Sequence, residues 1–291
     1  MKLYSTKHGV GRESSTGELE VLDTTDFDLG GLLKSNPSLD GVDTLPVRQT
    51  LSLDKDELLA PVPVPGCIYC VGANYESHVE EMASLNVGNP AAIKAVLEGI
   101  RTKPMFFTVP ATATNAPYAD IHLPTIAPDM VDYEIEVAAV IGGGGSNIPV
   151  ENAMRTVAGL TLANDVSARD FQRQAMAGHE LEFGHAKGLD GFKPMGPCLV
   201  TMDEFPDPLD LKIEARVNGE LRQSAQLRDL IHDIASCVSY ISRFHTLRPG
   251  DIILTGSPAG VGYFQGSFLK PGDLVEMAAT GIGTISNRVV A

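Results

Sequence analysis

Two glutamates, Glu134 and Glu136, lie in a segment whose pattern predicts a buried β-strand over residues 132–141. Alternate side chains of a strand point to the same face, so both carboxylates are expected on one side. Residues 137–141 are all apolar, which favours a strand that is buried on both faces. Buried ions cost on the order of several kcal/mol each unless a bound cation, a basic side chain or protonation compensates. The alternative is an exposed edge strand on which both glutamates meet water.

A third carboxylate, Asp165, follows an apolar run at 157–163 that predicts another buried strand. At the end of a strand, Asp165 could cap a following helix or join Glu134 and Glu136 as an acidic ligand. Oxygen ligands without thiolates or clustered imidazoles favour Mg²⁺, Mn²⁺ or Ca²⁺ over zinc.

His78 and Glu81 lie three positions apart, directly after the apolar segment 67–72. If their segment is helical, the two side chains share one face. A carboxylate beside an imidazole raises its basicity and fixes its tautomer, which a general base for water requires. The alternative is a surface pair at the start of a helix.

Positive charge and backbone donors are available elsewhere in the chain. Lys187 could supply a cation, although most single lysines are only solvated. The glycine-rich segment 255–262 could bring N–H groups and the hydroxyls of Thr255 and Ser257 close to an anionic ligand. It has neither of the common nucleotide-binding patterns.

The segment 179–185 places a second E-x-E pair between two histidines. It is not the H-E-x-x-H zinc motif, because Phe183 occupies the position of the second histidine. Gly178 and Gly184 flank the pair, so we expect a loop that covers the site as a lid.

The four cysteines are expected to be buried thiols. Cys67 and Cys70 form a C-x-x-C pair, but on a strand they face opposite sides. Cys198 and Cys237 do not supply the second pair that a zinc ribbon needs.

The composition limits the partners. A net charge of −15 and a pI near 4.8 argue against binding to nucleic acid or to an anionic membrane surface. No apolar run approaches the ~20 residues of a membrane helix. Residues 1–11 lack the apolar core of a signal peptide, so we expect a cytoplasmic protein.

The elements that position the candidate residues are mostly strands, which disfavours a doubly wound sheet. We expect an α+β, β-dominated fold in which a small N-terminal domain (1–65) precedes a catalytic domain (66–291), with the proline-rich connection 60–66 between them. Expected strands cover 19–22, 67–72, 105–109, 157–163, 211–217, 252–254 and 274–277; expected helices cover 89–98, capped by Asn89, 151–156 and the apolar stripe 227–241. Asn218-Gly219 predicts a type I′ hairpin turn, and 248–251 and 270–273 predict matching turns before strands.

Five motifs in this order resemble the fumarylacetoacetate hydrolase family, in particular its branch of acylpyruvate hydrolases and 2-hydroxyhepta-2,4-diene-1,7-dioate isomerases. The resemblance covers residues 66–291. The motifs are G-x-N-Y-x-x-H-x-x-E (72–81), D-Y-E-x-E (132–136), N-D-V-S-A-R-D-x-Q (164–172), A-K-G (186–188) and P-G-D-I-I-L-T-G-S-P-A-G-V-G (249–262).

The resemblance implies mixed sheets rolled around the site as a sandwich, usually in a homodimer. It implies Mg²⁺ or Mn²⁺, possibly Ca²⁺, and a small 2-oxo or 1,3-dicarbonyl acid as substrate, whose enolate the metal stabilises. Carried over by motif, the metal ligands are Glu134, Glu136 and Asp165, the catalytic residues are His78, Glu81 and Lys187, and the substrate-binding residues are Tyr75, Arg169, Gln172, Gly256 and Ser257.

Three departures from the family pattern bear on the substrate. Val109 stands where many relatives have a lysine that helps to hold a substrate anion. The segment 83–103 is longer than in compact relatives, and Ser257 stands where threonine is common. We therefore expect a substrate pocket that differs from the pocket in which relatives bind the commonest substrates of the family.

The resulting hypothesis is a hydrolase that cleaves a C–C bond in a 2,4-dioxo acid, an acylpyruvate, as in the catabolism of aromatic compounds. His78, oriented by Glu81, would deprotonate a water that attacks the distal carbonyl. The alternative is a decarboxylase or enol–keto isomerase of dicarboxylic 2-oxo acids, in which no water attacks. A noncatalytic β-rich module with a structural cation is the remote alternative, since such a site needs no His–Glu pair.

Overall fold

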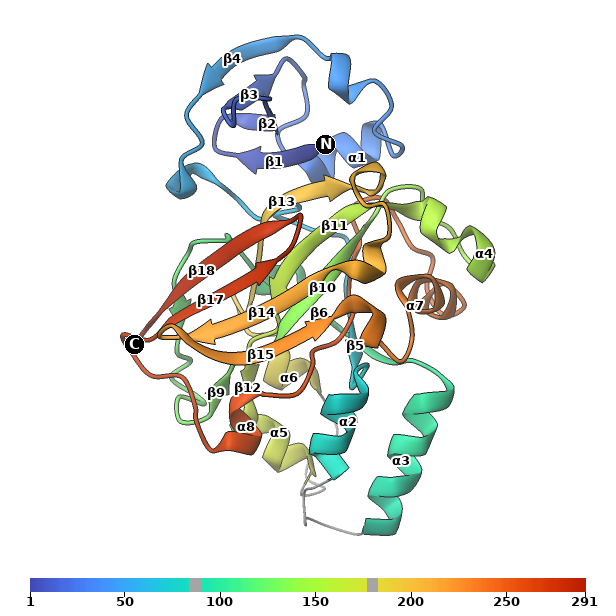
Figure 1. The fold of residues 1–291 in the computed structure, drawn as a ribbon, viewed down its shortest axis with the longest axis vertical. Helices are drawn as coiled ribbons and strands as arrows, with labels where there is room; N and C mark the ends of the chain where they lie inside the picture. Colours follow the sequence, from blue (N-terminus) through green and yellow to red (C-terminus); the bar gives the residue numbers. More distant parts are fainter. Residues whose placement is uncertain (84–89, 177–182) are drawn as a thin grey trace.

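Strands form the frame of the molecule (Figure 1), and the computed structural model describes residues 1–83, 90–176 and 183–291. The largest sheet has the strand order β4 (Val47–Leu51), β3 (Leu19–Leu22), β2 (Gly9–Glu13), β1 (Lys2–Thr6), β13 (Lys193–Thr201), β11 (Val157–Asn164), β10 (Ile135–Ile141), β16 (Ile252–Leu254), β5 (Ile68–Gly72) and β6 (Met105–Val109), and β7 (Thr114–Asn115) pairs with β13. The second sheet has the order β15 (Glu220–Gln226), β14 (Lys212–Val217), β17 (Leu274–Ala279), β18 (Gly283–Val290) and β8 (Ile121–His122), and β12 (Ser167–Ala168) pairs with β9 (Val131–Asp132). The predicted α+β, β-dominated class of mixed sheets is confirmed.

Strand β10 is buried over its whole length and lies between β11 and β16, both antiparallel to it. On one face, Val137 and Ala139 belong to the same buried cluster as Ile213 and Val275 of the second sheet. On the other face, Ala138 and its neighbours belong to a second buried cluster. The expectation of a strand buried on both faces is confirmed.

The expected strand 132–141 is interrupted after Asp132. The N–H of Glu134 donates to Oδ1 of Asn164, 3.1 Å away, and the carbonyl of Glu134 accepts from the N–H of Asp165 at 2.8 Å. Because a side chain takes the N–H, two residues separate the end of β9 at Asp132 from the start of β10 at Ile135. The interruption turns the backbone at the position where the acidic residues meet.

The N-terminal strands continue the large sheet (Figure 1), since β1 pairs antiparallel with β13 in the register Lys2↔Val200. Helix α1 (Leu29–Ser35) is capped by Asp28, whose side chain accepts from the N–H of Gly31. Residues 60–66, the expected boundary, lie outside helices and strands. The division into domains 1–65 and 66–291 stays a prediction.

Most helices gather at one end of the sheets (Figure 1). These are α2 (Glu76–Ala83), α3 (Pro90–Thr102), α5 (Arg169–Met176), α6 (Phe183–Lys187) and α8 (Gly262–Gln265). The long segment 83–103 contributes α3, whose Leu97 and Ile100 pack against Val79 of α2. The expected cap Asn89 and residues 179–182 of the expected lid lie outside the described residues, while Gly184 and His185 belong to α6. In the part of the chain that the structure describes, no helix is long and apolar enough to cross a membrane.

The apolar stripe 227–241 is not one helix, so this prediction is wrong in part. Leu227–Asp229 is a short 3-10 turn, and helix α7 (Ile234–Ile241) begins only after Asp233, which accepts from the N–H of Ser236. Between them, the N–H of Ile231 donates to the carbonyl of Asn74 at 2.8 Å, and the N–H of His232 donates to its side-chain oxygen at 2.9 Å. These long-range bonds replace the helical ones. Helix α7 packs beside α4 (Val150–Ala153); the predicted helix 151–156 consists of α4 and the 3-10 turn Met154–Thr156 that follows it.

The predicted turns are confirmed. Asn218 and Gly219 have φ of 54° and 81°, as a type I′ turn requires. In the two matching turns, the side chains of Asp251 and Asp273 accept from backbone N–H groups three residues earlier, each at 2.8 Å.

Candidate metal centre and active site

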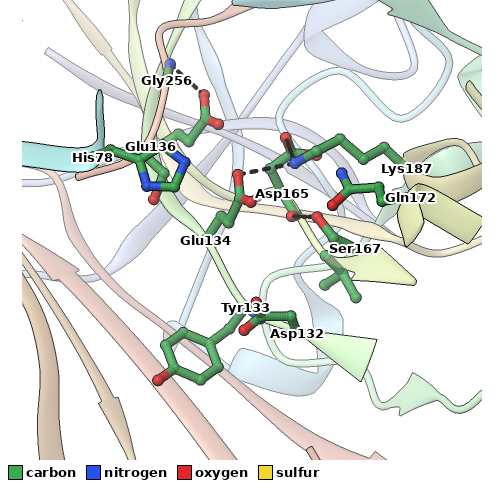
Figure 2. A network of polar contacts seen from close by, with 12 residues as sticks. His78, Asp132, Tyr133, Glu134, Glu136, Asp165, Ser167, Gln172, Lys187 and Gly256 are labelled. Atoms are coloured by element: carbon green, nitrogen blue, oxygen red, sulfur yellow. Dashed lines mark hydrogen bonds and ion pairs between the residues drawn. The ribbon is translucent and has the colours of Figure 1, made fainter. Parts of the chain in front are cut away.

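Three buried carboxylates meet where strand β10 begins and strand β11 ends. Glu134, Glu136 and Asp165 each offer an oxygen atom, and these atoms lie within 4.8 Å of one another. The antiparallel pair β10–β11 brings them together, because Ile135 and Asn164 are register partners. The structure therefore places Asp165 beside the two glutamates (Figure 2), as the acidic-ligand alternative required.

Two buried cations contact this group. Arg169 Nη2 lies 2.5 Å from Glu134 Oε1, and Lys187 Nζ lies 2.9 Å from Glu134 Oε2 and 2.5 Å from Asp165 Oδ2. Burial alone would raise the pKa of Glu134, but the charges of Lys187 and Arg169 outweigh it, so this pKa lies well below its ordinary value. The carboxylates in turn keep the pKa values of Arg169 and Lys187 above their ordinary values despite burial.

Glu136 has a different environment. Its Oε2 accepts a hydrogen bond of 2.6 Å from the backbone N–H of Gly256. Burial, followed by the charges of Asp165 and Glu134, raises the pKa of Glu136 well above its ordinary value. A proton or an added cation is therefore favourable at this carboxylate.

The donor set fits a hard divalent cation. All three side chains offer carboxylate oxygens, which Mg²⁺ and Mn²⁺ prefer. Asp165 Oδ1 is buried and has no hydrogen-bond donor in the described chain, although Lys193 Nζ lies 2.7 Å away. A buried oxygen with open lone pairs is what a metal ligand offers.

His78 and Glu81 form the expected pair on helix α2. His78 Nδ1 lies 3.0 Å from Glu81 Oε2, and Glu81 Oε1 accepts from the N–H of Gly260 at 3.1 Å. The His78 side chain is 11% exposed, packs edge to face on Phe264 and lies beside the acidic group (Figure 2). Since Nδ1 faces Glu81, Nε2 is the nitrogen that remains for proton transfer.

A cavity of about 90 Å³ opens beside these groups. Its wall has a polar part and an apolar part. The polar part consists of His78, Glu134, Arg169, Gln172 and Lys187; the apolar and aromatic part consists of Ala73, Met82, Met105, Phe107, Tyr263 and Phe264. The basic side chains of the polar part can bind an anionic group, and the apolar part excludes water.

The other expected substrate-binding residues divide into two groups. Arg169 and Gln172 line the cavity and contact each other, with Nη1 donating to Oε1 at 2.7 Å. Tyr75, Gly256 and Ser257 are not among the described residues of the cavity wall. Tyr75 is fully buried in the core, and burial raises the pKa of its hydroxyl.

The glycine-rich loop donates hydrogen bonds to carboxylates of the protein itself, and the expected anionic ligand there stays a prediction. Three of its N–H groups donate to carboxylates: Gly256 to Glu136, Gly260 to Glu81, and Gly262 to Asp132. The hydroxyl of Ser257 accepts from Gln223 Nε2 at 2.8 Å. The loop thus positions the acidic residues from behind.

Sequence reasoning missed Asp132 as a member of the site. This buried carboxylate lies 2.8 Å from Arg169 Nε and accepts from the N–H groups of Gly262 and Tyr263 at 2.7 and 2.9 Å. Asp132 thereby connects Arg169, in the polar part of the cavity wall, to Tyr263, in its aromatic part. Its position two residues before Glu134 was the available signal.

Lys193 was also missed, although a lysine in an otherwise apolar strand is unusual. Its side chain is fully buried behind Asp165. Val109, the departure noted in the sequence, is buried at the end of β6 and is not among the described residues of the cavity wall.

Comparison with known proteins defines the class. Residues 67–290 match the family described as "Fumarylacetoacetate (FAA) hydrolase C-terminal", and the chain belongs to this family of enzymes. The chain is 43% identical over 234 residues to "Oxaloacetate tautomerase FAHD2B, mitochondrial" of Bos taurus, which covers 80% of this chain and 69% of the relative. It is 41% identical over 234 residues, with the same coverage, to "Oxaloacetate tautomerase FAHD2A, mitochondrial" of Homo sapiens.

Solved structures agree with the fold. A putative HpcE protein from Mycobacterium smegmatis is 30% identical, with a TM-score of 0.83, and the match covers 100% of both chains. Maleylpyruvate hydrolase from Sphingobium sp. SYK-6, solved with manganese(II) and pyruvate, is 27% identical, with a TM-score of 0.75 over 100% of this chain and 99% of that one. Names in this family thus include tautomerases and hydrolases, and the buried acidic group is consistent with a divalent metal site.

Proposed function

We propose that this chain is a divalent-metal-dependent enol–keto tautomerase of a small 2-oxo acid, with oxaloacetate as the first substrate to test. The observation that carries this proposal is the His78–Glu81 pair, which opens onto a small cavity beside three buried carboxylates. Moving a proton between carbon and oxygen needs one oriented base and no attacking water. The names of the relatives at 41–43% identity support the same reaction class.

Glu134, Glu136 and Asp165 would hold Mg²⁺ or Mn²⁺, with Ca²⁺ as a third option. When bound, the cation polarises the 2-oxo group of the substrate and stabilises negative charge on its oxygen. The choice among these ions depends on the remaining metal ligands, which water and substrate supply.

The side chains of the cavity divide the remaining work. Nε2 of His78 takes a proton from the carbon next to the 2-oxo group, and Glu81 stabilises the resulting imidazolium, which then gives a proton to the 2-oxo oxygen to complete the enol. In the reverse direction, His78 takes the proton of the enol hydroxyl, and the imidazolium returns a proton to this carbon. Lys187 and Arg169 provide positive charge near the substrate carboxylate, and Gln172 holds the arginine in place.

Exchange of the carbon-bound protons of oxaloacetate with ²H₂O, followed by NMR, tests this proposal directly. We expect exchange that depends on Mg²⁺ or Mn²⁺, disappears after chelation and falls at least about 100-fold in His78→Ala. His122→Ala is the matched control, because His122 is exposed on β8. Full exchange in His78→Ala contradicts the role of this residue.

Hydrolysis of a C–C bond in a 2,4-dioxo acid is the second candidate. The specific observation in its favour is the apolar wall of Met82, Met105 and Phe107, which would accept an apolar acyl group. His78 would then deprotonate a water that attacks the distal carbonyl. Loss of enol absorbance with formation of pyruvate and entry of solvent ¹⁸O into the released acid would support hydrolysis, whereas CO₂ release from oxaloacetate would support a decarboxylase.

We also propose a homodimer and a cytoplasmic location, which rest on the family resemblance and on the sequence. The names of the two relatives include the word mitochondrial, so the cellular location of this protein needs its own test. Light scattering of the purified protein tests assembly, and fractionation of the source cells tests location.

A further inference from the structure

Lys193 begins strand β13, and its side chain has no solvent exposure. Its ammonium donates to three backbone carbonyls: those of Val166 at 3.2 Å, Phe192 at 3.1 Å and Lys187. An ammonium has three N–H groups, so all of its donors are used by the backbone. The position of the charge is therefore fixed by the fold.

The same ammonium lies 2.7 Å from Asp165 Oδ1, but this oxygen has no hydrogen-bond donor in the described chain. The two observations agree because the N–H groups of Lys193 point to carbonyls. Lys193 acts on Asp165 Oδ1 through charge alone and leaves the lone pairs of this oxygen open. The other oxygen, Oδ2, contacts Lys187.

The three carbonyls connect two parts of the site. Val166 directly follows Asp165, and Lys187 is the last residue of helix α6 and contacts both Asp165 and Glu134. One buried side chain thus holds a candidate ligand and the neighbouring cation of the cavity in a fixed relation.

The charge also opposes a divalent cation. A positive charge so close to a candidate ligand repels a dication bound to the same carboxylate, and in a buried site salt screens this repulsion little. We propose that Lys193 is a positioning residue that fixes Asp165 and Lys187, and that its charge weakens the hold of the site on the divalent metal. The proposal rests on the metal site of the proposed function and goes beyond it by making metal affinity a property that this lysine limits.

Titration of the metal-free protein with Mn²⁺ by calorimetry tests the proposal without turnover. The variants are Lys193→Met, which removes charge and donors, and Lys193→Gln, which removes the charge but keeps two N–H donors. Lys212→Met is the matched control, since Lys212 is exposed on β14. We expect the Kd for Mn²⁺ to fall by at least about tenfold in both Lys193 variants and to stay within about twofold in the control, at low and at high salt.

A damaged fold can only weaken metal binding, so tighter binding distinguishes this role from a purely structural one. A second readout concerns position: kcat should fall more in Lys193→Met than in Lys193→Gln, because only the former removes every side-chain donor to the three carbonyls. An unchanged or higher Kd in folded Lys193 variants overturns the proposal, and so does failure of both variants to fold. If the wild-type protein itself binds no Mn²⁺, the metal site of the proposed function is wrong.

Discussion

Glu81 holds His78 from one side and the glycine-rich loop from the other. Its Oε2 lies 3.0 Å from His78 Nδ1, and its Oε1 accepts from the backbone N–H of Gly260 at 3.1 Å. The orientation of the imidazole is thereby tied to the loop that also donates to Glu136. The proton-transfer group and the acidic group share one scaffold.

The first prediction follows from this contact. Glu81→Gln keeps the shape of the side chain but removes the charge that stabilises an imidazolium, so we expect kcat to fall by about 10- to 100-fold with little change in KM. Steady-state kinetics on the best 2-oxo acid substrate measure both constants. Glu80→Gln, on the exposed face of the same helix, is the control and should behave like the wild type. Equal kcat in Glu81→Gln and in the wild type would contradict the proposed pair.

Local sequence spacing predicted the parts of the site that depend on one element. The period of a strand placed Glu134 and Glu136 on one face, and the helical spacing of His78 and Glu81 gave their hydrogen bond. Addition of Asp165 required only that two neighbouring buried strands pair antiparallel.

Contacts between distant segments could not be predicted in this way. Asp132 meets Arg169 across 37 positions and Gly262 across 130 positions, so neither contact has a local pattern. The start of α7 likewise depends on bonds from Asn74 to residues 231 and 232, which compete with the helix that the apolar stripe predicts. Contacts between distant segments, rather than the local propensity for helix or strand, decide these positions.

The second prediction concerns Asp132. Asp132→Asn leaves the buried Arg169 with one partner charge fewer, and we expect a loss of stability of about 3–5 kcal/mol, as for other broken buried ion pairs. Because Arg169 and Tyr263 both line the cavity, KM should rise by about tenfold. Urea unfolding and steady-state kinetics measure the two effects. Asp129→Asn, at an exposed position, is the control, and a change of similar size there would contradict a specific role for Asp132.

The third prediction uses the raised pKa of Glu136. In the metal-free protein, folded Glu136 keeps its proton above the ordinary pKa of 4.5, at which the unfolded chain loses it. The free energy of unfolding therefore falls as pH rises from about 4.5 through the raised pKa. Glu136→Gln cannot ionise, so the variant should be more stable than the metal-free wild type at pH 7, on the order of 1.4 kcal/mol for each unit of pKa shift.

With Mn²⁺ present, the same substitution should act in the opposite direction. The wild type gains stability from bound metal, whereas Glu136→Gln has lost one ligand charge and gains much less. Thermal unfolding with and without Mn²⁺ at several pH values measures both effects. If the variant is more stable than the wild type in both conditions, Glu136 does not hold the metal. If it is less stable in both, Glu136 does not carry the excess proton.

The fourth prediction concerns the backbone donor to Glu136. Gly256 has φ of +100°, and a Cβ added there would lie 2.7 Å from Asn74 Cβ and 3.2 Å from the carbonyl of Val71. Gly256→Ala must therefore move the loop and its N–H away from Glu136, and we expect a loss of stability of about 2–4 kcal/mol. Gly219→Ala is the matched control, because Gly219 also has a positive φ, +81°, but nothing lies within 4 Å of the added Cβ. The control should lose only about 1–2 kcal/mol, the cost of the backbone conformation.

The functional part of this prediction is that Gly256→Ala weakens Mn²⁺ binding, whereas Gly219→Ala does not. The 2.6 Å bond from Gly256 fixes one oxygen of Glu136, and a carboxylate without this bond must be ordered by the metal itself. We expect the Kd for Mn²⁺ to rise by about tenfold, within the range found when groups that orient a metal ligand are removed. Calorimetric titration of the two folded variants measures the difference. Equal Kd values would mean that the loop supports the fold of the site without orienting its ligands.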